Sequence, residues 1–325
     1  MKPKVYVTRK IPERGLKMLR DFAEVKVWDG ELPPPRDVLL KEVEQVDGLV
    51  SLLTEKIDEE LFSVAKNLKV VSNYAVGFDN IDLKAATNRG IYITNTPGVL
   101  TETTADLAFA LLMAVARRIV EADKFVKEGK WKTWGPELLL GQDIYGSTLG
   151  LIGLGRIGLA MARRGKGFDM NVCYYDVFRR EELEAEYGIK YMEMEQLLRS
   201  SDFVSIHVPL TEDTRHLINE KTLSMMKKNA ILINTARGPI VDEKALYDAL
   251  KNGKIAGAGL DVTDPEPIKM DNPLLKLNNV VILPHIASAS VATRTKMAEM
   301  VAENMIAGLK GEVPPNLVNK EVIKD

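Results

Sequence analysis

The chain has 325 residues, of which 46% are hydrophobic and 28% are charged, as in a folded protein of about two domains. Its formal net charge of −2 favours neither nucleic acid nor an anionic membrane as a partner. The single cysteine, Cys173, excludes a disulfide framework, and the longest apolar run, residues 107–116, is too short to span a bilayer. Because the N-terminal residues also lack the apolar core of a signal peptide, we expect a cytoplasmic globular protein.

Residues 1–98 alternate between short apolar runs and segments with helical spacing. The apolar runs are typical of buried strands and lie at residues 4–8, 25–28, 48–53, 69–76 and 91–94. The helical segments between them include residues 15–22 and 58–65. This alternation predicts a parallel sheet with helices on its faces.

A long helix is expected after this first sheet. Thr103 and Asp106 are spaced as in a capping box, so the helix is predicted at residues 105–129. Its first half is nearly all apolar, which indicates burial on every side and a place at the seam between two domains. The loop that follows carries Trp131 and Trp134, which either pack on their own subunit or reach a second one.

The strongest pattern in the chain is a short apolar run followed by Gly153, Gly155 and Gly158 in the spacing G-x-G-x-x-G. A helix is predicted from Arg156, so its free N–H groups and positive dipole end would face a phosphate. A second apolar run ends at Asp176, about 20 residues further on, where a carboxylate can accept hydrogen bonds from both hydroxyls of an adenosine ribose. Together these features predict a dinucleotide-binding site of the Rossmann type.

The alternation of strands and helices then resumes. Further strands are predicted at residues 203–208, 230–235, 256–261 and 280–283, separated by helices at residues 193–200, 220–227 and 243–251. With the two strands around the glycine motif, they make a second parallel sheet of about six strands. The last helical pattern, residues 289–309, finds no strand to follow in the second domain and is predicted to pack on the first.

The predicted fold class is therefore α/β, with two Rossmann-like, doubly wound parallel-sheet domains and a cleft between them. Residues 1–98 and 289–325 would form a discontinuous substrate domain. Residues 99–288 would form the dinucleotide-binding Rossmann domain.

Three residues that are suited to chemistry follow strand ends in the second half: Arg237, Glu266 and His285. Taken singly, each has a structural explanation, as a solvated surface cation, a loop glutamate between prolines or a histidine that caps a strand. Ligands of open α/β sheets bind outside the carboxyl ends of the strands. Because all three residues would lie there, beside the dinucleotide site, we expect them to act together.

Four ordered motifs resemble those of the D-isomer specific 2-hydroxyacid dehydrogenases, and the resemblance covers essentially the whole chain. The motifs are Gly153-Leu154-Gly155-Arg156-Ile157-Gly158, Asn234-Thr235-Ala236-Arg237-Gly238, Gly259-Leu260-Asp261-Val262 with Glu266-Pro267, and Pro284-His285-Ile286. Within the family, the chain is most similar to the archaeal glyoxylate/hydroxypyruvate reductases. It departs from the family at Ala287, where glycine is usual. The alanine would add a methyl group beside the nicotinamide pocket and would remove no reacting group.

The resemblance implies a site for a 2-keto acid. Arg237 would hold the substrate carboxylate and polarise the carbonyl with its planar fork of donors. His285 would donate the proton, and Glu266 would favour the charged ring and select its tautomer. The other implied substrate contacts are the backbone amides of Val76 and Gly77 and the side chains of Leu52 and Leu53.

The resemblance also implies NAD as the cofactor, and no metal is expected. The implied contacts in the glycine motif are Gly153, Leu154, Gly155, Arg156, Ile157 and Gly158, and Thr104 and Arg156 would contact phosphate. Asp176 would bind the ribose, and the adenine would lie against His207, Val208 and Pro209. The contacts toward the nicotinamide would be Thr235, Ala236, Arg237, Asp261, His285 and Ala287, with Asp261 as the carboxamide anchor. Asp176 would face the extra phosphate of NADP, which disfavours NADP. Arg179 and Arg180 lie close enough in sequence to soften this preference.

We therefore expect NAD(H)-dependent reduction of glyoxylate or hydroxypyruvate, with His285 as proton donor. The alternatives are another dehydrogenase of the family, acting on D-lactate, 3-phosphoglycerate or phosphite, or a dinucleotide-sensing corepressor that binds without turnover. A homodimer is also expected, joined through residues of about 100–145. Trp131, Trp134 and the three leucines at 138–140 would otherwise leave an apolar patch in water.

Overall fold

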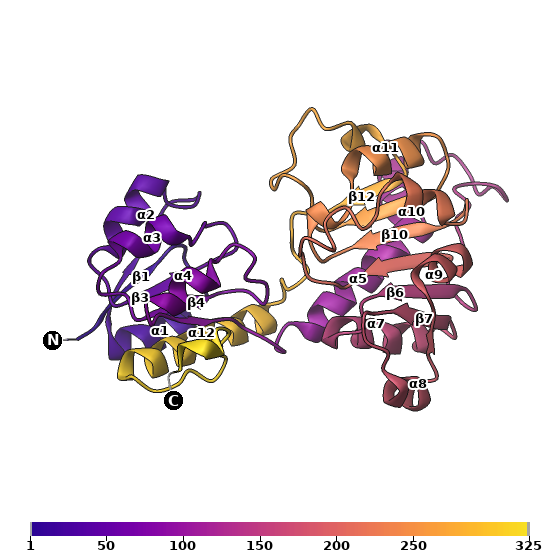
Figure 1. The fold of residues 1–325 in the computed structure, drawn as a ribbon. Coiled ribbons are helices and arrows are strands. Elements are labelled where there is room, and N and C mark those ends of the chain that lie inside the picture. Colours follow the sequence, from indigo (N-terminus) through magenta and orange to yellow (C-terminus); the bar gives the residue numbers. More distant parts are fainter. Residues whose placement is uncertain (1, 324–325) are drawn as a thin grey trace. The chain divides into compact units, whose positions relative to one another are not determined.

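The computed structural model describes residues 2–323, and the chain divides into two compact α/β units (Figure 1). Unit 1 consists of Met1–Leu100 and Ala289–Asp325, and unit 2 consists of Thr101–Ser288. Each unit contains its own parallel sheet. The predicted α/β class with two Rossmann-like sheets is confirmed.

The described part of unit 1 contains a five-stranded sheet in the order β2-β1-β3-β4-β5. Its strands are β1 (Lys4–Val7), β2 (Glu24–Val27), β3 (Gly48–Ser51), β4 (Val70–Asn73) and β5 (Tyr92–Thr94). All neighbours are parallel, and Val50 of β3 lies opposite both Val7 and Ser72. Every residue of β3 and β4 is buried, which explains why these strands read as continuous apolar runs.

Helices cover both faces of this sheet. They are α1 (Glu13–Phe22), α2 (Arg36–Val43), α3 (Glu59–Val64), α4 (Leu83–Asn88) and α12 (Val291–Lys310), with a short 3-10 helix η3 (Lys320–Val322) near the C-terminus. Helices α2, α3 and α4 pack against Tyr6, Leu49 and Val71 on one face. Helices α1 and α12 lie side by side on the other face (Figure 1). Ser290 caps the start of α12, and Val301 and Met305 are fully buried along its length.

The described part of unit 2 contains a seven-stranded parallel sheet in the order β12-β11-β10-β9-β6-β7-β8. Its strands are β6 (Thr148–Ile152), β7 (Asn171–Tyr175), β8 (Lys190–Tyr191), β9 (Phe203–Ile206), β10 (Ile231–Asn234), β11 (Gly257–Leu260) and β12 (Val280–Ile282). The expectation of about six strands missed β8, because two residues are too few for a periodic pattern. The strand order reverses between β6 and β9, and ligands of open α/β sheets bind at such a switch point.

Helices lie on both faces of this second sheet. The described helices of unit 2 are α5 (Thr101–Ala116), α6 (Ile119–Lys127), α7 (Arg156–Gly167), α8 (Glu181–Tyr187), α9 (Met194–Ser200), α10 (Glu220–Met225) and α11 (Glu243–Lys251), with short 3-10 helices η1 (Gly238–Ile240) and η2 (Pro273–Lys276). Helices α5 and α7 bury Leu112 and Met161 in one core cluster, and α9, α10 and α11 bury Leu197, Leu223 and Leu246 in another. No helix within residues 2–323 is long and apolar enough to cross a membrane.

The prediction of one helix at residues 105–129 was wrong. Helix α5 already begins at Thr101, so Thr103 lies inside the helix and not before its first turn. Arg118 then adopts a left-handed conformation with φ of 53°, and α6 starts after it. The guanidinium of Arg118 donates to both carboxylate oxygens of Glu121, at 2.9 and 2.8 Å, across the break.

Helix α5 is also not buried on every side. Asp106 is exposed and accepts a hydrogen bond from Arg164 of α7, with 2.9 Å between Nε and Oδ1. The apolar face of α5 packs on α7 and on β10, β11 and β12 of its own unit. It therefore serves as a covering helix of the unit 2 sheet.

Candidate active site

The glycine motif forms the turn between β6 and α7. Gly153 has a φ of 95°, and a Cβ on it would lie 2.9 Å from the backbone carbonyl of His207. A Cβ on Gly158 would lie 2.2 Å from the carbonyl oxygen of Gly153. A Cβ on Gly155, by contrast, would meet nothing within 4 Å. The first and third glycines therefore permit close packing, and the second leaves open space at the helix N-terminus, where a pyrophosphate would fit.

Asp176 directly follows β7, the strand beside β6. Its Oδ2 accepts a hydrogen bond from the Leu154 amide at 2.7 Å, which holds the carboxylate against the glycine turn. Its Oδ1 receives only a long contact, 3.5 Å, from the Phe178 amide. The predicted ribose contact would therefore use Oδ1.

The other predicted cofactor contacts in unit 2 follow β9 and β10 or begin a helix. Thr104 lies in the first turns of α5, and Arg156 begins α7, which packs against α5. Val208 and Pro209 follow His207 after β9. The Nε2 of His207 lies 2.9 Å from Ser205 Oγ, and burial lowers the pKa of His207 to about 4, so its ring is neutral at pH 7.

A buried hydroxyl without a partner supports the fit of a cofactor. Thr235 follows β10 and is only 8% exposed. Its Oγ1 is buried and has no hydrogen-bond partner among the described residues. A buried hydroxyl without a partner costs free energy, and a bound polar group would remove that cost. Together with the open space above Gly155, this orphaned hydroxyl fits a dinucleotide.

Arg237, Glu266 and His285 follow the ends of β10, β11 and β12, which are neighbours in the sheet. The Nδ1 of His285 lies 2.8 Å from Glu266 Oε2. The other Glu266 oxygen accepts the Thr263 amide at 3.2 Å. A Cβ on Gly238 would lie 2.0 Å from the Thr263 carbonyl oxygen, so the turn after Arg237 rests directly against the loop that carries Glu266. The structure thus brings the His285–Glu266 pair together and places Arg237 next to its loop.

Two buried polar residues that our sequence reasoning did not select as supports hold the backbone beside Arg237 and His285. Asn234, 1% exposed, spans the turn before Arg237. Its Nδ2 donates to the Arg237 carbonyl at 2.8 Å and its Oδ1 accepts the Ala236 amide at 3.0 Å. Asp261 is fully buried and accepts the amides of Ile286 and Ala287 at 2.8 and 2.7 Å. The sequence feature that could have identified them is a polar residue at the end of an apolar run, such as Asn234 at the end of β10.

Asp261 was predicted to anchor the nicotinamide carboxamide. Both of its oxygens already accept backbone N–H groups next to His285. Burial raises the pKa of Asp261, and the amides of Ile286 and Ala287 oppose that rise by stabilising the carboxylate. The structure therefore adds a supporting role, and the carboxamide contact stays a prediction.

In unit 1, the predicted clamp at Val76 and Gly77 follows β4. Asn95 Nδ2 donates to the Val76 carbonyl at 2.8 Å, and Asn73 Nδ2 donates to the Gly77 carbonyl at 2.8 Å. No hydrogen bond from the Val76 or Gly77 amide is found among the described residues. The predicted carboxylate contact would use these two N–H groups.

The Leu52 and Leu53 loop follows β3 and is held by two residues that sequence reasoning missed. The carboxylate of Glu55, 4% exposed, accepts the Leu52 amide at 2.6 Å and the Thr8 hydroxyl at 2.8 Å. Asn80 Nδ2 donates to the Leu52 carbonyl at 2.9 Å. The backbone of this loop is therefore fixed from both sides.

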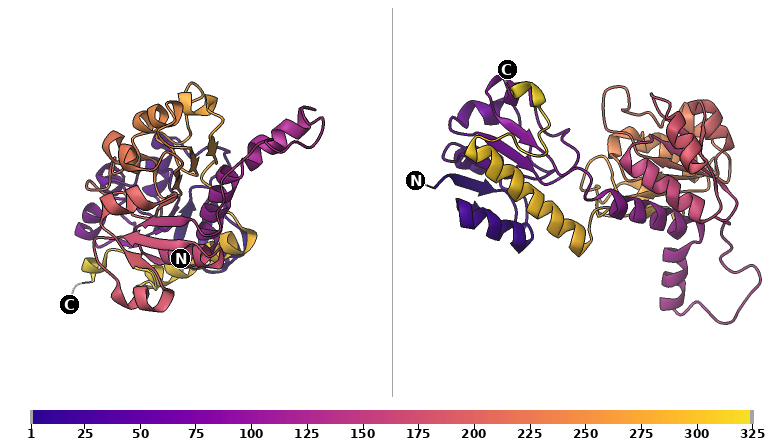
Figure 2. Two further views of the ribbon diagram at one scale, coloured as in Figure 1. Left: turned by 90° about the vertical axis from the view of Figure 1, so that its right-hand side faces the viewer. Right: turned by 90° about the horizontal axis from the view of Figure 1, so that it is seen from below.

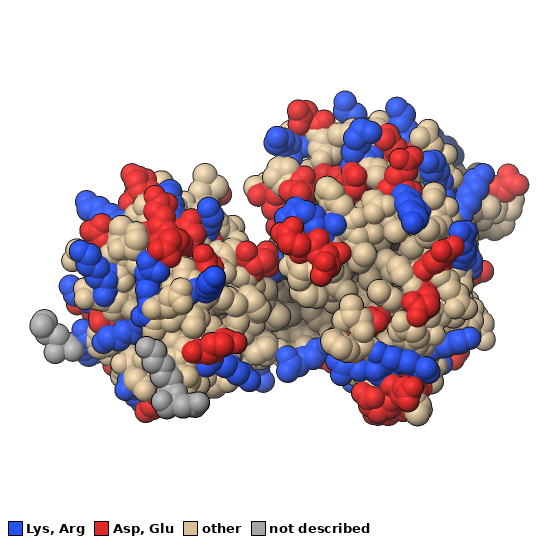
Figure 3. Space-filling model, in the orientation of Figure 1, with Lys and Arg blue, Asp and Glu red and all other residues tan. Residues whose placement is uncertain are grey.

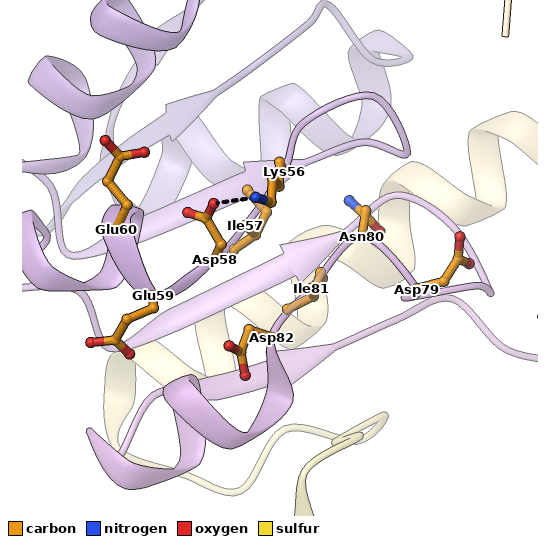
Figure 4. Close-up of a pocket in the computed structure, with 9 residues that line it drawn as sticks. All are labelled: Lys56, Ile57, Asp58, Glu59, Glu60, Asp79, Asn80, Ile81 and Asp82. Atoms are coloured by element: carbon orange, nitrogen blue, oxygen red, sulfur yellow. Dashed lines mark ion pairs between the residues drawn. The ribbon is translucent and has the colours of Figure 1, made fainter. Parts of the chain in front are cut away.

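A separate pocket of about 460 Å³ opens on unit 1, and carboxylates dominate its lining (Figure 4). Asp58 and Asp82 cap α3 and α4, where they accept N–H groups at 3.2 and 2.9 Å. Lys56 pairs with Asp58 at 3.1 Å. Because a 2-keto acid is itself an anion, this acidic pocket does not suit it.

The chain is similar to known proteins over both units. Residues 109–287 match the family described as "D-isomer specific 2-hydroxyacid dehydrogenase, NAD binding domain". A glyoxylate reductase from Korarchaeum cryptofilum is 62% identical over 325 residues, which cover 100% of this chain and 98% of that protein. Among solved structures, a protein from Thermus thermophilus has a TM-score of 0.92 at 50% identity, covering 97% of this chain and 99% of that chain.

A second solved structure carries a cofactor. It is an NADPH-dependent glyoxylate/hydroxypyruvate reductase from Sinorhizobium meliloti in complex with NADP and malonate, with a TM-score of 0.87 at 35% identity, covering 99% of this chain and 98% of that chain. The resemblance that the motifs carried is thereby confirmed. The chain belongs to the D-isomer specific 2-hydroxyacid dehydrogenase family.

Proposed function

We propose that this protein is an NAD(H)-dependent glyoxylate reductase that also accepts hydroxypyruvate. The observation that carries the proposal is the His285–Glu266 pair, with 2.8 Å between Nδ1 and Oε2, past the ends of β11 and β12 in the sheet that also carries the glycine turn. The 62% identity to a protein named glyoxylate reductase supports the substrate class.

The proposed reaction gives a 2-keto acid one hydride at C2 and one proton at the carbonyl oxygen. A bound reduced nicotinamide supplies the hydride. Because Nδ1 of His285 faces Glu266, Nε2 is the ring nitrogen that donates the proton. The ring becomes neutral in that step and regains a proton from solvent. The carboxylate of Glu266 stabilises the charged ring before the transfer.

Arg237 binds the substrate carboxylate in this proposal. Its planar guanidinium can donate two parallel hydrogen bonds to a carboxylate, which also orients the neighbouring carbonyl. In unit 1, the substrate contacts that the resemblance implies are the amides of Val76 and Gly77 and the side chains of Leu52 and Leu53. The supporting observation is that both loops have their backbone held by buried polar side chains.

NAD is the proposed cofactor, with the residue roles that the resemblance implies. The family binds NAD(P), and the relative from Sinorhizobium meliloti uses NADPH. Cofactor choice within the family therefore depends on local residues. Here the carboxylate of Asp176 is held against the Leu154 amide at 2.7 Å, where an added phosphate would meet a negative charge.

We also propose a homodimer joined through residues of about 100–145. Helix α6 and the loop after it project from unit 2 in both views of Figure 2. Trp131, Trp134 and Leu140 are 56%, 77% and 63% exposed on this segment. A second copy of the same chain would cover these apolar side chains. The cytoplasmic compartment stays a prediction from the sequence.

Steady-state kinetics on glyoxylate, hydroxypyruvate, pyruvate, 3-phosphohydroxypyruvate and phosphite test the proposal. NADH oxidation should be fastest with glyoxylate or hydroxypyruvate. Negligible turnover of all 2-keto acids, with NADH still bound, would instead indicate a dinucleotide sensor. Efficient NAD reduction by phosphite or D-lactate alone would reassign the substrate within the family.

A further inference from the structure

Arg179 lies three positions after Asp176, on the side of the site where the adenosine ribose would lie. An arginine fork there is the usual partner of the extra phosphate of NADP. In this structure the fork is occupied. Nε of Arg179 donates to Glu184 Oε1 at 2.8 Å, and its Nη2 donates to Glu184 Oε2 at 2.9 Å. The guanidinium also lies 5.7 Å from the centre of the Tyr191 ring, within cation–π range.

Glu184 is itself fixed to the sheet. It lies on α8, and its side chain is only 16% exposed. The hydroxyl of Tyr174, a fully buried residue of β7, donates to Glu184 Oε1 at 3.0 Å. The same hydroxyl accepts the Arg180 amide at 2.7 Å, so the loop between β7 and α8 is tied to this network. The hydrogen bonds from Arg179 lower the pKa of Glu184, which therefore stays charged at pH 7.

The first turn of α8, next to this network, is acidic. Acidic side chains gather over α8 in Figure 3, and its first turn carries Glu181 and Glu182 in addition to Glu184. Glu181 Oε1 lies 3.6 Å from Arg179 Nη1 and adds a second carboxylate beside the fork. Two carboxylates thus surround the cation that would otherwise attract a phosphate.

We propose that Glu184 is a specificity-determining residue for the cofactor, because it holds the Arg179 fork and so denies NADP its cationic partner. This inference rests on the proposed use of NAD(H). Asp176 repels the extra phosphate directly, and Glu184 removes the attraction that would compensate. Substitution of Asp176 alone therefore leaves NADPH without a bidentate donor.

The test compares four enzymes: wild type, Asp176→Ser, Glu184→Gln and the double variant. Catalytic efficiency with NADH and NADPH is measured at saturating glyoxylate, and Kd for both dinucleotides is measured by protein fluorescence. In the Asp176→Ser background, Glu184→Gln should raise the efficiency with NADPH by at least about threefold, the range of one partly exposed charge-assisted contact. Efficiency with NADH should change by less than about twofold.

Two controls isolate the fork from general charge. Glu182→Gln removes a charge from the same helix turn at an exposed position, and it should leave the NADPH efficiency of Asp176→Ser unchanged. Adding Arg179→Ala to the double variant should abolish the gain, whereas adding Arg180→Ala should preserve it. A gain that Glu182→Gln reproduces, or that survives Arg179→Ala, would overturn the proposal.

A failure of the proposed reaction can be distinguished from a failure of the proposed role of Glu184. If the wild type turns over no 2-keto acid, the glyoxylate reductase assignment fails. The ratio of the Kd values for NADPH and NADH across the same variants still reports on Glu184.

Discussion

The Nδ1 of His285 and the Oε2 of Glu266 lie 2.8 Å apart, with side chains 27% and 38% exposed. The carboxylate selects the tautomer of a neutral ring and stabilises the charged ring. The Glu266→Gln variant keeps the shape of the side chain and removes its charge. We expect kcat/KM for reduction to fall, because the ring that donates the proton loses the carboxylate that orients it and selects its tautomer.

The reverse reaction provides a check on the same variant. Oxidation of the hydroxy acid uses the same ring as proton acceptor, so kcat/KM for oxidation should fall as well. The measurement is kcat/KM for both directions. If both values match those of the wild type, Glu266 does not position His285.

Arg237→Lys should lose the bidentate fork while it keeps a positive charge. We expect a loss of ~2–4 kcal/mol in transition-state stabilisation for every 2-keto acid. The Kd for NADH, measured by fluorescence quenching, should change much less. Turnover near the wild-type rate would show that Arg237 does not bind the substrate carboxylate. A conservative control is Lys244→Arg, an exposed position on α11.

Cofactor preference should follow from Asp176. The extra phosphate of NADPH would face its carboxylate, and the ribose would lose hydrogen bonds, for a cost of ~2–3 kcal/mol or about 30- to 150-fold in kcat/KM. Kinetics with both cofactors at one ionic strength give this ratio. Equal efficiencies would contradict the role of Asp176.

His207 predicts an acid-side loss of stability. Burial lowers its pKa from the ordinary 6.5 to about 4, so the folded protein binds fewer protons here than the unfolded chain. The stability contributed by the neutral ring is complete above pH 6.5 and is lost as the pH falls toward 4, by at most about 3 kcal/mol. Denaturant midpoints of wild type and His207→Gln, compared from pH 7.5 to 4.5, isolate this contribution. The wild type should lose more stability than the variant over that range, and parallel curves would contradict the assignment.

The projecting segment should join two chains. Light scattering at micromolar concentration should report twice the mass of one chain. Trp134→Glu with Leu140→Glu should shift the protein toward monomer, because charged side chains would replace two exposed apolar ones. The control Leu32→Glu alters an equally exposed apolar residue, 76%, on unit 1 and should leave the mass unchanged. A stable wild-type monomer would contradict the prediction.

Local patterns in the sequence were sufficient to predict the parallel sheets and the glycine turn. A buried parallel strand must be apolar on both faces, so β6 and β10 read as continuous runs, and the turn after β6 needs glycine at Gly153 because its φ is positive. Arg237, Glu266 and His285 were selectable for the same reason. The ends of neighbouring parallel strands meet at one edge of the sheet, so position along the chain already indicates position in space.

Only the tertiary structure showed how these residues are supported. Asn234 and Asp261 hold Arg237 and His285 through backbone groups that no periodic pattern marks. The two-residue strand β8 exists because β7 offers it an edge, and it places Tyr191 under Arg179. The sequence alone determined that an arginine stands three positions after Asp176. The position of α8 decides whether the guanidinium of Arg179 is open to a phosphate or bound by Glu184. The spacing of the residues along the chain does not determine this contact, because it depends on how the surrounding fold packs.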